Sequence, residues 1–160
     1  MAAVEARLAA MGLALPAPIE FPAGVARRFP FVNVRGGRAF VSGHGPQQPD
    51  GSFAGPFGKV GAEVSLDDAV ALARKTGLSM LASLQRTLGD LDRIVGWARV
   101  FGMVNSAPGF DRHPAVINGF SELILDLYGP QVGRHARSAI GVAALPFDIA
   151  VEIEAEVLIA

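Results

Sequence analysis

The residues best suited to chemistry lie in the last quarter of the chain. Arg137 stands at the head of an apolar stretch, Pro146 marks a turn, and Glu152 opens a second stretch with a strand-like pattern. A guanidinium binds a small carboxylate through two parallel hydrogen bonds, and a nearby glutamate can activate water for attack. An arginine so close to a buried strand needs a partner. Two interpretations of Arg137 stay open: a structural salt bridge with a glutamate, or a site for a carboxylate ligand.

Two strands are expected to carry these residues, one over 136–143 and one over 149–159. Odd positions of the second strand are apolar, whereas Glu152, Glu154 and Glu156 share its other face. We expect Glu154 and Glu156 on a solvated face, and the pattern leaves the place of Glu152 open. A hairpin with a loop of about four residues would set Arg137 opposite Glu152. A one-residue slip would place them on opposite faces.

The rest of the chain predicts a two-layer α/β fold. Gly36-Gly37 is a strong turn signal between strands at 31–35 and 39–43. A helix begins after Ser65, and its apolar residues recur at helical spacing up to Gly89. A long strand follows over 93–105, and then a second amphipathic helix before the C-terminal strands. Two helices over one mixed sheet are expected.

The second helix and the loops carry their own signals. Asp111 or His113 is the expected N-cap, Pro114 suits the first turn, and Gly129-Pro130 is the expected stop. Residues 44–61, rich in Gly and Pro, are expected to form a long loop. We expect one domain over 1–160, in which 1–22 are an N-terminal helix and an extended connector.

Composition limits the possible partners. The chain is 51% hydrophobic, yet it has no apolar run near the about 20 residues that span a bilayer, so burial in an oligomer is expected and a membrane is not. The net charge of −1 argues against nucleic-acid binding, which favours a clustered positive excess. The absence of cysteine excludes disulfides and thiolate chemistry. The N-terminus lacks the basic region of a signal peptide, so a cytoplasmic location is expected.

The C-terminal strands carry the motif Arg137-Ser138-x-x-x-Val142-Ala143-x-Leu145-Pro146, followed by Glu152-Ile153-Glu154-Ala155. This motif resembles the signature of the RidA/YjgF family, small trimeric proteins that hydrolyse reactive imines. Phe40-Val41-Ser42-Gly43 and Val116-Ile117-Asn118-Gly119 are similar to its strand and helix segments. A longer branch, described as YjgF/chorismate-mutase-like endoribonucleases (L-PSP), is closer still. It is matched by Lys59-Val60-Gly61, Phe101-x-x-Val104-Asn105-Ser106 and Gly133-Arg134-His135-Ala136-Arg137-Ser138.

The resemblance implies a chorismate-mutase-like fold, a homotrimer with a central barrel, and ligand clefts between neighbouring subunits. It implies that Arg137 binds the carboxylate of a 2-imino acid and that Glu152 positions the attacking water. The backbone amides of Gly43 and Ala139 would line the pocket, and Asn118 would lie near it. This hydrolysis to a 2-oxo acid and ammonia needs no metal or cofactor.

Two departures from the family pattern affect the pocket. The usual cysteine two residues after the arginine is Ala139, and a common hydroxylated aromatic is replaced by Phe29 or Phe31. Both changes remove polar groups, so water positioning would be weaker or the substrate different. Two alternatives therefore stay open beside deamination: an endoribonuclease, and a non-catalytic trimer that binds small carboxylates.

The histidines and the tryptophan have other expected uses. His135 lies between two arginines, which would depress its pKa, and is a candidate for anion binding. His44 is expected to be an ordinary loop histidine, with a proton carrier as the alternative. His113 is expected to be a cap or a solvent-facing residue. The three histidines lack metal-ligand spacing, so no metal is expected, and Trp97 is expected in a core or interface.

Overall fold

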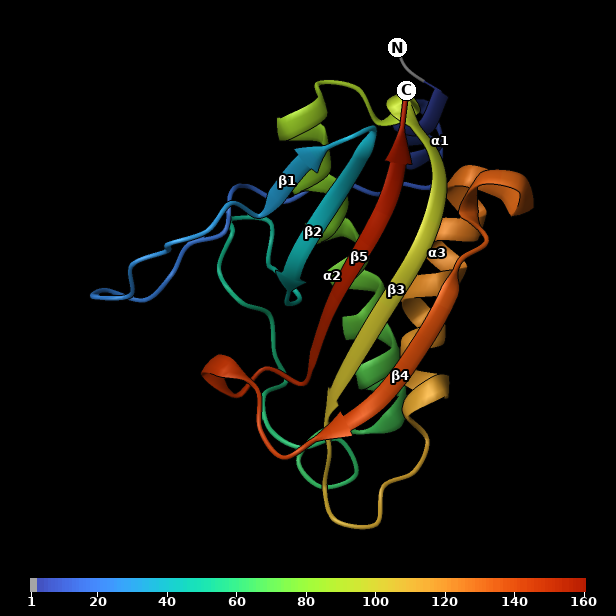
Figure 1. The fold of residues 1–160 in the computed structure, drawn as a ribbon. Helices are drawn as coiled ribbons and strands as arrows, with labels where there is room; N and C mark the ends of the chain where they lie inside the picture. Colours follow the sequence, from blue (N-terminus) through green and yellow to red (C-terminus); the bar gives the residue numbers. More distant parts are fainter. Residues whose placement is uncertain (1–2) are drawn as a thin grey trace.

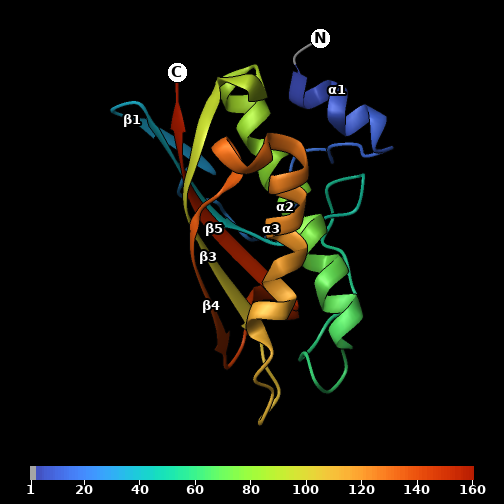
Figure 2. The same ribbon diagram turned by 90° about the vertical axis from the view of Figure 1, so that its right-hand side faces the viewer.

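The computed structural model describes residues 3–160, in which a five-stranded mixed sheet carries its helices on one face (Figures 1 and 2). The elements are α1 (Ala3–Ala10), β1 (Val32–Arg35), β2 (Arg38–His44), α2 (Leu66–Leu88), the short η1 (Leu91–Arg93), β3 (Ile94–Asn105), α3 (His113–Gly133), β4 (Ala136–Val142), η2 (Pro146–Asp148) and β5 (Val151–Ile159). This confirms the predicted α/β class with a mixed sheet. None of the described helices is long and apolar enough to cross a membrane.

The strand order is β1-β2-β5-β3-β4, and it contradicts the predicted C-terminal hairpin. β4 pairs with β3 in parallel, and β5 inserts between β2 and β3, antiparallel to both. The chain leaves β3, crosses over through α3 and returns as β4, which is the connection that parallel neighbours require. Arg137 therefore pairs with Val100, and Glu152 pairs with Met103 on the other side of β3.

The first hairpin and α2 follow their sequence signals. Gly36 and Gly37 both have positive φ in the turn between β1 and β2, as a tight hairpin requires. The Ser65 side chain caps α2 by accepting from the Asp68 amide at 3.1 Å. Gly89 ends the helix in the left-handed conformation, with φ of 82°.

The helix α3 packs closely on α2, at Gly119. A Cβ on Gly119 would lie 2.1 Å from the Val70 carbonyl oxygen, so only glycine fits there. The predicted cap of α3 was wrong, because Arg112 occupies the N-cap position without a side-chain hydrogen bond. Pro114 lies in the first turn as predicted, and Gly129, with φ of 70°, interrupts the helix before a last turn ending at Gly133.

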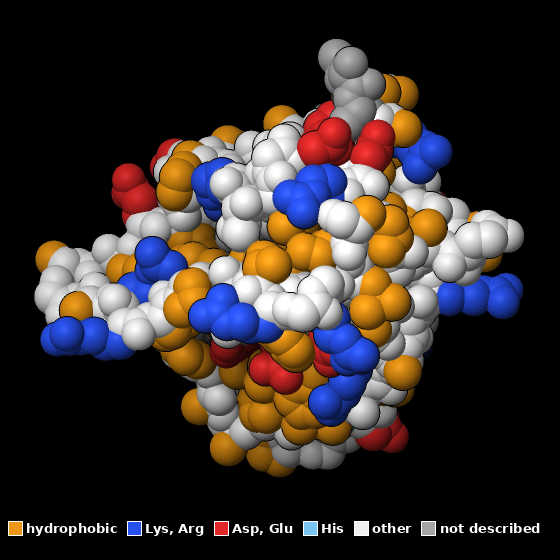
Figure 3. All heavy atoms as spheres, turned by 45° about the horizontal axis from the view of Figure 1, so that its top comes forward, with side chains coloured by type: hydrophobic (Ala, Val, Ile, Leu, Met, Phe, Trp, Pro, Cys, Tyr) orange, Lys and Arg blue, Asp and Glu red, His pale blue; other side chains and the backbone are white. Residues whose placement is uncertain are grey.

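The two faces of the sheet differ in cover. The core lies between the sheet and the helices, where Trp97 is 2% exposed and packs edge-on against Phe120 and Tyr128. None of the helices described in residues 3–160 covers the opposite face (Figure 2). On it Phe40, Ile140 and Leu158 are 43%, 41% and 39% exposed, and Figure 3 shows such hydrophobic side chains among arginines and carboxylates. Apolar side chains on an open sheet face are typical of an interaction surface.

Candidate functional site

Arg137 is held against α3 by three hydrogen bonds. Its Nη1 donates to Oδ1 of Asn118 at 2.9 Å and to Oγ of Ser121 at 3.1 Å, and its Nη2 donates to the Pro114 carbonyl at 3.3 Å. No carboxylate of residues 3–160 forms an ion pair with it, so the predicted alternative of a structural salt bridge was wrong within the described chain. Because a guanidinium has five N–H groups, two donors of Arg137 have no partner among residues 3–160 and can bind a ligand.

His135 extends this network behind Arg137. Its Nδ1 lies 2.7 Å from the Gly133 carbonyl and its Nε2 lies 2.9 Å from Oγ of Ser121. A carbonyl only accepts, so Nδ1 carries the proton and Nε2 accepts from the serine hydroxyl. Desolvation by burial lowers the pKa of His135, and the charge of Arg137 lowers it further. The direction agrees with the prediction made from the arginines on either side of His135. Together with Leu125 and Arg134, these side chains line an open cavity of about 330 Å³.

Glu152 lies in a different, apolar pocket. A cavity of about 230 Å³ is bounded by Glu152, the backbone of Gly43 and Gly45, and side chains from the connector before β1 and from η2. No donor among residues 3–160 makes a hydrogen bond to the Glu152 carboxylate. Desolvation by burial, with repulsion from Glu154, raises the pKa of Glu152. A carboxylate with a raised pKa beside an apolar pocket is well suited to accept a proton from water.

Arg137 and Glu152 lie on opposite faces of the sheet within one chain. Arg137 points to α3, whereas Glu152 alternates with Val151 and Ile153, which are buried on the helix side. A single copy of the chain therefore does not bring the two predicted catalytic residues together.

The other predicted site residues divide between these two places. Asn118 and His135 lie beside Arg137, and Ala139 follows two residues on along the same face of β4, paired with Gly102. Gly43 and Phe31 belong to the pocket of Glu152.

Several residues of the site had no signal in the sequence. Ser121 links Arg137 to His135, but an isolated serine in a helix predicts no function. Phe21 and Phe53 from two separate loops and Phe147 from η2 come together in the Glu152 pocket. Loop residues carry no periodicity from which such a meeting could be predicted.

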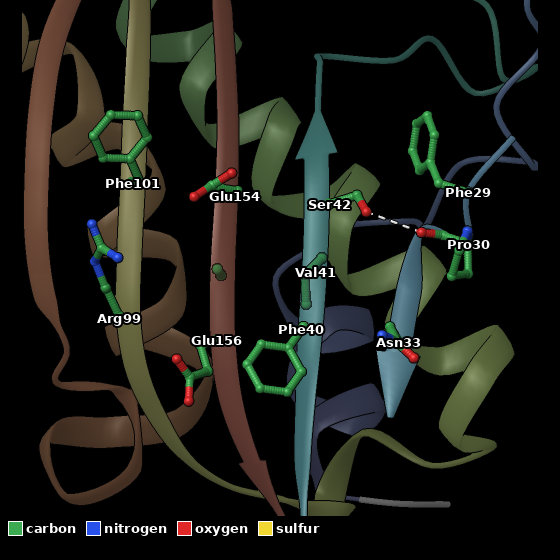
Figure 4. A pocket seen from close by; sticks show the side chains of 11 residues that line it. Phe29, Pro30, Asn33, Phe40, Val41, Ser42, Arg99, Phe101, Glu154 and Glu156 are labelled. Atoms are coloured by element: carbon green, nitrogen blue, oxygen red, sulfur yellow. Dashed lines mark hydrogen bonds between the residues drawn. The ribbon is translucent and has the colours of Figure 1, made fainter. Parts of the chain in front are cut away.

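A third cavity, of about 540 Å³, lies on the open face of the sheet (Figure 4). Arg99 and Phe101 project from β3, Glu154 and Glu156 from β5, and Phe40 from β2. Glu156 pairs with Arg38. Glu154 is exposed on this face, as predicted, and Glu156 is half-buried there. The residues that line this cavity differ from those that line the cavity at Arg137.

His44 and His113 are engaged in structural contacts. His44, predicted as a loop residue, ends β2 and is fully buried, with Nδ1 2.6 Å from the Ser42 carbonyl and Nε2 2.8 Å from Oγ of Ser83. Burial lowers its pKa from 6.5 to about 4, so the alternative of a proton carrier near neutral pH loses its basis. His113 bonds Oγ of Ser106 at 2.8 Å.

One group of carboxylates has the spacing of a metal site. Ligand atoms of Glu5, Asp90 and Asp92 lie within 4.8 Å of one another. Asp92 accepts from the first amides of α1, and Glu5 accepts from the Leu91 amide at 3.1 Å. Helix capping accounts for these carboxylates.

Comparisons with known proteins agree with this architecture. The curated protein TCP17 of Trypanosoma cruzi is 39% identical over 95% of this chain and 91% of its own length. The crystal structure of protein Atu1372, of unknown function, from Agrobacterium tumefaciens has a TM-score of 0.86 and 35% identity, covering 98% of this chain and 92% of that one. A structure described as a putative endoribonuclease from Shewanella oneidensis has a TM-score of 0.86 and 26% identity, covering 98% and 99%. The model of the family described as "YjgF/chorismate mutase-like, putative endoribonuclease" matches residues 5–154, and the chain belongs to this family, which confirms the predicted RidA/YjgF resemblance.

Proposed function

We propose that this protein hydrolyses reactive 2-imino and enamine acids to 2-oxo acids and ammonia in a cleft between two copies of the chain. The observation that carries the proposal is Arg137, which three hydrogen bonds fix in place and which has no carboxylate partner among residues 3–160. Its two free donors suit bidentate binding of a substrate carboxylate.

A second copy is needed because Arg137 and Glu152 lie on opposite faces of the sheet. The uncovered sheet face, with Phe40, Ile140 and Leu158 exposed, supports association of copies through this face. The homotrimer with a central barrel that the family resemblance implies would bury it. In that assembly Arg137 of one subunit would face Glu152 of the partner subunit across the cleft.

The chemistry follows from the two residues. Arg137 holds the substrate carboxylate, and Glu152 accepts a proton from a water molecule whose oxygen attacks the imine carbon. The electron pair of the C=N bond moves to nitrogen, which takes up a proton and gives a tetrahedral carbinolamine. Collapse of this intermediate forms the C=O bond, breaks the C–N bond and expels ammonia, so that imine and water yield one oxo acid and one ammonia. An enamine first takes a proton at carbon and loses one from nitrogen, which gives the imine.

Release of ammonia and oxo acid from enzymatically generated 2-imino acids tests the proposal. We expect turnover by the wild type, loss of at least about a hundredfold in kcat/KM for Arg137→Ala, and a fall mainly in kcat for Glu152→Ala. Arg35→Ala is the matched control, because Arg35 is exposed and, among residues 3–160, its side chain bonds only the neighbouring Val34 carbonyl. Turnover that survives in Arg137→Ala would refute the assigned role.

Cleavage of RNA is the second candidate, and the family description favours it. The net charge of −1 opposes it, because contacts to phosphates require clustered positive charge. Arg137→Ala separates the two candidates. We expect it to abolish carboxylate-dependent turnover but to reduce non-specific RNA cleavage only slightly. Carboxylate binding without any turnover would instead favour a non-catalytic binding protein.

A further inference from the structure

Five phenylalanines line the same pocket as Glu152. We call them the phenylalanine cluster: Phe21, Phe29, Phe31, Phe53 and Phe147. Phe21 stacks on Phe31 with centroids 6.0 Å apart and planes 5° apart, and Phe53 stacks on Phe147 at 5.0 Å and 23°. Phe21 also meets the edges of the second pair, and Phe29 meets Phe31 edge-on at 5.7 Å. The rings therefore form one continuous aromatic wall.

The cavity inside this wall has the size of an aromatic side chain. Its volume is about 230 Å³, and an apolar cavity of roughly 150 Å³ is enough to hold a benzene ring. Glu152 is the one charged side chain among its lining residues, and the remaining side chains, which include Ile19, Val25 and Ile149, are apolar. A ligand in this cavity meets aromatic rings, aliphatic side chains and the carboxylate of Glu152.

Phe147 occupies a costly backbone conformation at the rim. Its φ is 57°, which is rare for a bulky residue, and the following Asp148 has the same value. The turn is held because the Gly58 amide donates to the Asp148 carbonyl at 2.9 Å and Asn105 Nδ2 donates to its Oδ1 at 3.3 Å. This conformation keeps the ring stacked on Phe53 although it is 39% exposed.

We infer that the phenylalanine cluster selects substrates with an aromatic or large aliphatic side chain, placed in the cavity with the reacting carbon at Glu152. This specificity rests on the proposed function. An acidic side chain would lose its hydration without gaining a partner and would be repelled by Glu152. A methyl side chain would leave most of the cavity unfilled.

Competition among imines tests this specificity. We compare kcat/KM for the imino acids generated from phenylalanine, leucine, alanine and glutamate. We expect the first two to exceed alanine by at least about tenfold and glutamate by more. Phe147→Ala should reduce the phenylalanine-to-alanine ratio at least about fivefold. Phe57→Ala is the matched control, since Phe57 is 45% exposed and does not line the cavity.

Calorimetric titration with phenylpyruvate and pyruvate shows which proposal fails, the side-chain specificity or the deaminase activity. Equal turnover of the four imines overturns the specificity and leaves the deaminase intact. Absence of turnover, with phenylpyruvate bound at least about tenfold more tightly than pyruvate in wild type but not in Phe147→Ala, overturns the deaminase and supports the selective pocket. Absence of turnover and of any binding preference overturns both.

Discussion

Gly43 lies directly against the carboxylate of Glu152. A Cβ on Gly43 would be 2.0 Å from Oε1 of Glu152 and 2.9 Å from its carboxyl carbon. Because Gly43 has no side chain, the Glu152 side chain of β5 can lie against β2 at this position. The atom in the way is the end of a flexible side chain, so a methyl group at Gly43 can be accommodated if the carboxylate moves.

This contact predicts that Gly43→Ala disables Glu152 without unfolding the protein. We expect a change in melting temperature of a few degrees or less, and a loss of kcat similar to that of Glu152→Ala. In the double variant the two losses should not add, because both remove the same carboxylate from its position. Gly96→Ala, which only touches Leu158 at 3.3 Å, is the control. Additive losses would show that Gly43 acts by another route.

The raised pKa of Glu152 predicts an acidic limb in the pH profile. The carboxylate acts as a base, so kcat/KM falls as the pH drops through its pKa, which desolvation and Glu154 raise above the ordinary glutamate value of about 4.3. Glu154→Gln removes the repulsion and should shift this limb to lower pH, whereas Glu156→Gln should leave it in place. The measurement is kcat/KM between about pH 4.5 and pH 8. A limb that stays fixed in Glu154→Gln contradicts the assignment.

Ser121 is predicted to position Arg137 for binding. It accepts from Nη1 of Arg137 at 3.1 Å and donates to Nε2 of His135 at 2.9 Å. Loss of one hydrogen bond of about 1 kcal/mol should raise KM for an imino acid roughly fivefold in Ser121→Ala, with kcat changed less than about twofold. Ser138→Ala, next to Arg137 but on the other face of β4, should leave both unchanged. A fall in kcat at constant KM would exclude a positioning role.

Local signals of the sequence predicted most elements but not how the strands pair. The Gly36-Gly37 turn, the Ser65 cap and the alternating apolar residues of β5 act over a few neighbours, and the structure confirms them. The pairing of β4 with β3 depends on the crossover through α3, and the assumption that a short connection implies a hairpin was wrong there. The same holds for the site. The residue types of Arg137 and Glu152 marked them as candidates, but the face of the sheet on which each lies depends on how the strands pair.

The phenylalanine cluster shows what a sequence pattern leaves out. Phe21, Phe53 and Phe147 are far apart along the chain and come from irregular segments, so no period connects them. Their meeting depends on the conformation of the turn at Phe147, whose positive φ is unexpected for that residue type.

His44 connects the stability of the fold to pH. It is fully buried between the Ser42 carbonyl and Oγ of Ser83, and burial, only partly offset by the Ser42 bond, lowers its pKa to about 4. The unfolded chain, with a pKa of 6.5 at this histidine, binds the proton more tightly than the folded chain does. The contribution of neutral His44 is therefore complete above about pH 6.5 and is lost as the pH falls towards 4.

This linkage predicts an acid-sensitive fold whose sensitivity depends on one residue. Between pH 6.5 and pH 4 the wild type should lose on the order of 3 kcal/mol of unfolding free energy through His44, on top of what its carboxylates contribute. His44→Gln should be less stable than wild type at about pH 7.5, because it disturbs a buried, hydrogen-bonded site, yet its stability should fall less on acidification. Urea unfolding at several pH values measures both. If the two proteins lose stability in parallel, protonation of His44 does not destabilise the fold in acid. The folded protein must then tolerate a charged imidazole at this buried position.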